Sequence, residues 1–162
     1  MKTLKAVLAE MILPFICCWF FMSVLVDIIA IPTVFKYISN MEEAGKIGMT
    51  VFHRFNCFEI FFGVFILLGL FSKSQKLKFL ISIASFLFLL SLFYTFYMTP
   101  MITEASISLH SVAATDPAYE MIRSEHTTYH NLYRYFDTTK LFVLLFFAGM
   151  MIRLNIKEGK NV

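Results

Sequence analysis

Charge is scarce in this sequence. Only 15% of the 162 residues are Asp, Glu, Lys or Arg, whereas 59% are hydrophobic and the mean hydropathy is +0.73. A water-soluble domain carries about 25% charged residues, and a small one could not easily bury 20 Phe and 10 Met. In a bilayer these side chains need no burial. The composition therefore predicts an integral membrane protein with one domain, residues 1–162.

Several functional motifs are also missing. The three cysteines, Cys17, Cys18 and Cys57, lie in apolar runs without a CxxC pair, so we expect buried free thiols and no disulfide. No glycine-rich phosphate loop, nucleophile elbow or HExxH sequence is present. The lysines flank apolar segments, where anionic lipid accounts for them, so no nucleic-acid partner is expected. With no catalytic residue to assign, an enzyme is not the leading interpretation.

Four apolar stretches are long enough to cross a bilayer, which takes about 20 helical residues. They cover about residues 11–31, 50–71, 77–99 and 135–154. Pro32 and Pro100 are expected to end the first and third spans, because proline disfavours helix in the residue before it. The first run is long and is interrupted by Glu10 near its start, which indicates a signal anchor retained as the first helix. The sequence thus predicts an all-α bundle of four transmembrane helices.

The links between the spans also carry a pattern. In the first outer link, residues 32–49, the apolar positions have helical spacing: Val34, Phe35, Ile38 and Met41. We therefore expect an amphipathic helix on the membrane surface there. In the longest link, residues 101–134, Asp116 followed by Pro117 is typical of a helix start. The helix that begins there is expected to run into the last span.

Basic residues predict the orientation. The side that holds both termini and the 72–77 link carries eight Lys or Arg and two acids, whereas the rest of the chain carries six and nine. The positive-inside rule places the termini and this link in the cytoplasm. We expect a bacterial inner-membrane protein whose two long links face outward.

Polar residues inside the predicted spans gather in their outer halves. These residues are Asp27, His53, Arg54, Asn56, Glu59, Tyr94, Tyr97, His130, Tyr133, Asp137 and Lys140. Ionisable groups within a membrane are costly and mark functional sites. We therefore interpret them as a ligand-binding pocket that opens outward and is closed by apolar packing toward the cytoplasm. The alternative is that they only join the helices through ion pairs and hydrogen bonds.

Spacing supports the clustering. The last span carries four of these residues at i, i+3, i+7 and i+10: His130, Tyr133, Asp137 and Lys140. They fall within about 80° around a helix. Glu59 lies about 13 Å below the outer end of its span, near the middle of a core about 30 Å thick. It should be protonated, paired with Arg54 or Lys140, or exposed to a wet cavity.

Three functions fit this pattern. The leading one is binding or transport of a small ligand or ion. The second is a non-catalytic subunit or scaffold of a larger membrane complex, or a homo-oligomer, with the Phe-rich lipid face as the partner surface. The third is a haem- or metal-dependent membrane oxidoreductase. In that case His126 and His130, at i and i+4, could bind a transition metal, and His53 and His130 could ligate the iron of haem b from two sides.

Parts of the sequence resemble an uncharacterised four-helix family that includes animal transmembrane protein 205 and bacterial proteins labelled domain of unknown function 4149. The resemblance rests on Ile31–Phe35 with Ala44–Phe55, on the Tyr-rich end of the third span from Tyr94 to Pro100, and on His130–Lys140. It implies four helices and no settled activity. A more distant similarity to copper-resistance membrane proteins and four-helix haem proteins adds some weight to the metal and haem hypotheses.

The haem and metal hypotheses predict a visible spectrum. If histidines ligate haem or a transition metal, the purified protein should show a Soret band or stoichiometric metal by elemental analysis. A sample with neither removes this third function.

Overall fold

The computed structural model describes residues 2–73 and 77–159, and those residues form helices and turns without a β-strand. The helical elements are α1 (Lys2–Glu10), α2 (Ile12–Val24), η1 (Leu25–Ala30), α3 (Ile31–Tyr37), α4 (Met41–Ser72), α5 (Lys78–Phe93), η2 (Tyr94–Met98), α6 (Thr99–Ser111) and α7 (Tyr119–Gly159). The segments η1 and η2 are π-helical. Because α2, η1 and α3 are continuous, as are α5, η2 and α6, the chain makes four long helices.

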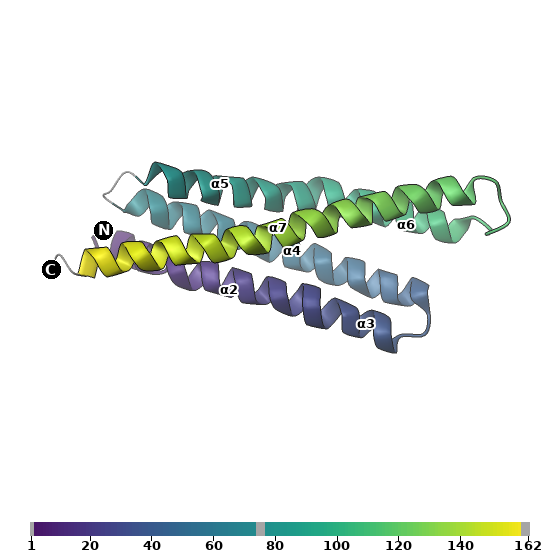
Figure 1. The fold of residues 1–162 in the computed structure, drawn as a ribbon, viewed down its shortest axis with the longest axis horizontal. Helices are drawn as coiled ribbons and strands as arrows, with labels where there is room; N and C mark the ends of the chain where they lie inside the picture. The colour runs from purple at the N-terminus through teal and green to yellow at the C-terminus, as the bar shows by residue number, and fades with distance from the viewer. Residues whose placement is uncertain (1, 74–76, 160–162) are drawn as a thin grey trace.

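All four long helices are long and apolar enough to cross a membrane. This confirms the predicted all-α bundle with four candidate spans. They run alternately up and down, so that α1, the end of α4, the beginning of α5 and the end of α7 share one end of the bundle (Figure 1). We call this the terminal end and the opposite one the distal end. Around the bundle, α4 packs against α2 and α5, and α7 packs against α2, α5 and α6. Thus α4 and α7 face each other across the diagonal.

The two prolines do not end helices, contrary to the sequence prediction. Pro32 lies in α3 and Pro100 in α6, each just after a π-helical segment. A proline inside a helix lacks an N–H donor, and its ring clashes with the carbonyl four residues earlier. The wider π turn relieves this clash. The first long helix therefore continues to Tyr37 and the third to Ser111.

The amphipathic surface helix predicted for residues 32–49 is also wrong. Its first part continues the first long helix, and its second part is the beginning of α4. The chain turns between them at Ile38, whose backbone is extended, and at Asn40, which caps α4. The Asn40 side-chain oxygen accepts hydrogen bonds from the backbone N–H groups of Glu42 (3.0 Å) and Glu43 (3.3 Å). The helical spacing was real, but it belonged to two long helices.

The last link follows the prediction more closely. The Asp116 carboxylate accepts a hydrogen bond from the Ala118 N–H at 2.8 Å. Directly after this turn, α7 begins at Tyr119 and runs without a break to Gly159. The last long helix therefore begins well before the apolar residues of the predicted fourth span.

The core changes character along the bundle. Toward the terminal end it is apolar, built from side chains such as Ile16, Ile66, Leu87 and Phe147. Toward the distal end the buried set includes Asn56, Glu59, Thr95, Thr99, Asp137 and Lys140. The polar and apolar halves expected from the sequence are therefore both present, and the polar groups lie among the four long helices.

Charged side chains connect two helices at the surface of the bundle. At the terminal end, Lys73 Nζ pairs with the Glu158 carboxylate at 3.0 Å and joins α4 to α7. Lys76 and Lys160, which contribute to the predicted orientation, lie outside the described residues.

The cysteines are free but not buried: Cys18 and Cys57 are exposed and Cys17 is half-buried. An apolar segment of a membrane helix has a lipid face as well as a core face, which composition alone does not separate.

Glycine at position 69 allows α1 to lie against α4. A Cβ there would come within 2.5 Å of Ile12 Cγ1 and 2.6 Å of the Leu8 carbonyl oxygen, whereas a Cβ at Gly149 meets nothing within 4 Å. We expect Gly69→Ala to destabilise the protein by about 1–3 kcal/mol through overpacking. Gly149→Ala should be neutral or slightly stabilising, because alanine favours helix. Unfolding titrations in mixed micelles measure both, and equal midpoints would contradict the close approach of α1.

Candidate functional site

A lysine side chain lies in the centre of the bundle. Lys140, on α7, is 1% exposed and forms ion pairs with Glu59 on α4 (Nζ–Oε1, 2.5 Å) and with Asp137, one turn earlier on α7. Its ammonium group also lies 5.3 Å from the ring centroid of Tyr94 and 5.5 Å from that of Phe55. Such cation–π contacts contribute about 0.5–2 kcal/mol each. The lysine is therefore held by two carboxylates and two aromatic rings.

Glu59 links three helices. Its Oε1 atom accepts one hydrogen bond from Lys140 and a second from the indole Nε1–H of Trp19 on α2 at 2.9 Å. Glu59 is fully buried, and its other oxygen, Oε2, has no hydrogen-bond partner among the described residues. Of the two partners considered from the sequence, Lys140 is the one that the structure pairs with Glu59. Arg54 instead lies exposed on α4.

A third carboxyl group approaches from η1. Asp27 lies beside Asp137 and within the field of Lys140 and Glu59, and its buried Oδ2 atom has no partner in the described part of the chain. The four groups, hereafter the charged cluster, are Asp27, Glu59, Asp137 and Lys140. If all were ionised, their net charge would be −2. A buried charge costs several kcal/mol unless it is compensated, so this site favours an additional positive charge.

Apolar side chains bound the charged cluster toward the terminal end. Phe62 on α4 and Leu144 and Phe147 on α7 follow directly along the buried faces of their helices. Toward the distal end lies a hydrogen-bonded layer. The Asn56 amide nitrogen donates to Thr99 Oγ1 at 2.9 Å, and the Tyr133 hydroxyl donates to Asn56 Oδ1 at 3.4 Å. The charged cluster thus lies between an apolar layer and a hydrogen-bonded layer, and none of its four residues lines the two open spaces at the distal end.

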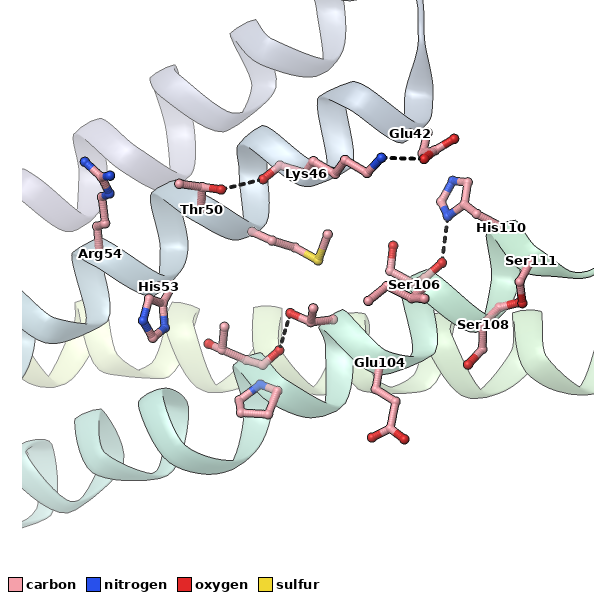
Figure 2. Close-up of a pocket in the computed structure, with 15 residues that line it drawn as sticks. Glu42, Lys46, Thr50, His53, Arg54, Glu104, Ser106, Ser108, His110 and Ser111 are labelled. Atoms are coloured by element: carbon pink, nitrogen blue, oxygen red, sulfur yellow. Dashed lines mark hydrogen bonds and ion pairs between the residues drawn. The ribbon is translucent and has the colours of Figure 1, made fainter.

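The open space lies farther out, between α4 and α6. A groove of about 1160 Å³ there is lined by His53 and Arg54 among others (Figure 2). His53 points toward α6, and Arg54 points to the other side of α4. Tyr97 is 52% exposed and stacks on Phe93 instead of facing the core. The structure therefore separates His53, Arg54 and Tyr97 from the residues of the charged cluster.

The histidines line two neighbouring spaces. His126 and His130 line a smaller cavity with Tyr133, His53 lines the groove, and His110 lines both. The rings of His126 and His130 are 5.7 Å apart at their centroids. Within the described residues, no three His, Cys, Asp or Glu side chains are arranged to hold a metal ion. This arrangement gives no support to a haem held between His53 and His130.

Three residues that the sequence did not point to lie at the site: Trp19, Ser23 and Thr99. Trp19 and Ser23 are buried and precede Asp27 by eight and four residues on one face of the first long helix. A buried indole N–H needs a hydrogen-bond partner, so the single Trp of the chain near Asp27 was a usable signal. Thr99, which anchors Asn56, gave no such signal, because a threonine at the end of a span is common.

Chemically, the charged cluster can hold a proton or exchange one. Buried oxygen atoms without a partner among the described residues belong to Asp27 and Glu59 in the cluster and to Ser23 and Tyr94 near it. The carboxylate oxygens accept hydrogen bonds, and the two hydroxyls can also donate, beside carboxyl groups that cannot all be charged at low cost. Lys140 already occupies the space between two of the carboxylates, which leaves little room for a coordinated metal ion.

The fold and the cluster together define a class: an all-helical chain with the construction of an integral membrane protein and a charged site in its bundle centre. No family model, curated protein or solved structure matches this chain.

We expect Lys140→Met to destabilise the fold by about 3–5 kcal/mol, because it leaves buried carboxylates without their cation. Adding Glu59→Gln should recover at least about 1 kcal/mol of this loss, since the two side chains are coupled. Unfolding of the two single variants and of the double variant in mixed micelles measures this coupling. Lys46→Met is the control, because Lys46 pairs with Glu42 at the exposed beginning of α4. The unfolding midpoint of this variant should hardly differ from that of the wild type. Additive effects of Lys140 and Glu59 would argue against the ion pair.

Proposed function

We propose that this protein is a membrane carrier in which the charged cluster binds a proton, and that protonation is coupled to movement of a small ligand or ion through the bundle. The observation that carries the proposal is one buried lysine surrounded by three carboxyl groups. Fully ionised, the three carboxyls and the ammonium carry a net charge of −2. A proton shared by Asp27 and Asp137 reduces this charge to −1 without needing a coordination shell.

The position of the site supports transport over simple helix pairing. A single ion pair would be enough to join two helices, whereas this cluster draws side chains from α2, η1, α4 and α7 to one point. Replacing such a group by apolar side chains often leaves a protein as stable or more so. Intramembrane carboxyl groups around a basic residue are characteristic of proton relays.

The π-helical segments support movement at the site. Asp27 lies in η1, and Tyr94, whose ring faces Lys140, lies in η2. Breaks of this kind in α-helices are frequent at functional sites. Here each one places a residue of the site where the helix is least regular. A change of the π turn would move Asp27 or Tyr94 relative to Lys140.

The membrane and the orientation that we propose for the carrier rest on the sequence. We propose the bacterial inner membrane with both termini in the cytoplasm, because basic residues dominate the terminal end. The distal groove would then face outward. Membership of the family of transmembrane protein 205 and domain of unknown function 4149 remains part of this proposal and rests on the motifs described above.

The proton-binding role predicts a loss of proton movement when the shared carboxyl is removed. In proteoliposomes with an internal pH dye, an imposed membrane potential should drive proton uptake in the wild type. Asp27→Asn should reduce the rate by at least about tenfold, the effect of about 1.4 kcal/mol or more on the barrier. Glu43→Gln, which alters an exposed carboxyl at the beginning of α4, serves as the matched control.

Infrared spectra provide a second readout that needs no transported ligand. A band from a protonated buried carboxyl should be present in the wild type and in Glu43→Gln and absent from Asp27→Asn. If the wild type shows neither this band nor proton uptake above empty vesicles, the proposal fails.

A further inference from the structure

A cavity of about 230 Å³ lies at the distal end, on the far side of the hydrogen-bonded layer from the charged cluster. It is enclosed by α3, α4, α6 and α7. Its walls are Phe35, Met41, Gly45, Gly48, Met49, Phe52, Thr99, Ile102, Ser106, His110, His126, His130 and Tyr133. All four long helices of the bundle thus contribute to it.

Two glycines on α4 keep this space open. Glycine inside a helix costs about 1 kcal/mol relative to alanine, so it needs a reason. Gly63 has one, because a Cβ there would come within 2.9 Å of Phe88. Gly45 would meet nothing within 4 Å, and Gly48 would make only ordinary contacts with Phe35 and Ile31 at 3.6–3.9 Å. Close packing therefore does not explain these two glycines, and both of them line the cavity.

The chemistry of the walls restricts the ligand. None of the lining residues is Asp, Glu, Lys or Arg, so the cavity offers no fixed charge to balance an ion, and burying an unpaired charge is costly. Aromatic and aliphatic side chains form most of the surface. A dry apolar cavity of about 150 Å³ is large enough to bind benzene. A volume of 230 Å³ accordingly suits one substituted ring.

The hydrogen-bonding side chains of the cavity come from α6 and α7. The His110 Nδ1 atom lies 2.6 Å from the carbonyl oxygen of Ser106. Since a carbonyl only accepts, Nδ1 carries the hydrogen, and Nε2 of the neutral ring is left as an acceptor. His126 and His130 add two more imidazoles from α7. A ligand with one hydroxyl or N–H group could place its ring among the apolar residues and donate to an imidazole.

We propose that this cavity binds a neutral, single-ring aromatic molecule with a hydrogen-bond donor, of the phenol type. The site does not depend on the proton-binding role of the charged cluster. It is connected to the cluster through Tyr133, which lines the cavity and donates to Asn56, the neighbour of Glu59 by one helical turn. A ligand that displaces the Tyr133 hydroxyl would disturb the hydrogen-bonded layer beside the charged cluster.

Fluorine NMR with para-fluorophenol as the probe tests this site on the full chain in lipid nanodiscs. The wild type should show a saturable shift or broadening beyond that of empty nanodiscs. Gly45→Val adds a side chain to the cavity wall at a position where a Cβ meets nothing within 4 Å. It should weaken this binding at least tenfold, and Gly45→Ala should have a smaller effect. Gly149→Val is the matched control, because Gly149 is also helical and also has open space around its Cβ position.

One set of results supports the proposal, and another contradicts it. Binding by the wild type and Gly149→Val that is lost in Gly45→Val, with no binding of the anion para-fluorobenzoate, supports the proposal. Equal signals from Gly45→Val and the wild type, or tighter binding of para-fluorobenzoate, would overturn it. Proton uptake in proteoliposomes, measured on the same variants, shows whether the cavity and the charged cluster function independently. Normal uptake by Gly45→Val leaves the carrier proposal intact whatever the NMR result.

Discussion

The ion pair between Lys140 and Glu59 is the constraint on which the arrangement of the bundle depends. An ammonium group at this depth cannot reach water, so it must find its counter-charges inside the protein. Glu59 reaches it from the diagonally opposite helix, and Asp137 from one turn away on the same helix. The ion pair therefore fixes how α4 and α7 are rotated about their own axes. The hydrogen bond from Trp19 to Glu59 fixes the rotation of the first long helix in the same way.

This constraint explains why the bundle is asymmetric along its length. Beyond Glu59 and Lys140 toward the terminal end, shape complementarity between apolar side chains suffices, and glycines at positions 63 and 69 let neighbouring helices approach closely. Toward the distal end, the buried polar groups need partners, and the helices separate enough to enclose a groove and a cavity. Tight packing and polar chemistry thus occupy opposite halves of the same four helices.

The sequence was sufficient for some features and insufficient for others. Length and apolarity of four segments predicted the spans, because the thickness of a bilayer sets a strong requirement. The spacing of Tyr133, Asp137 and Lys140 predicted their common face, and all three are buried. Spacing within one helix does not say how that helix is rotated against its neighbours, so Arg54 and Tyr97 were grouped with residues that they do not face. The rule that proline ends a helix failed at Pro32 and Pro100, because a π turn before each one accommodates the ring.

The position of Trp19 has a consequence for spectroscopy. The chain contains a single tryptophan, and its indole N–H is bonded to the carboxylate that holds Lys140. Indole emission responds to nearby charge and to the loss of a hydrogen bond, so the natural fluorophore of this protein sits on its charged cluster. Its emission can therefore follow events at the buried carboxylates in the unmodified chain, without an attached dye and without background from a second tryptophan.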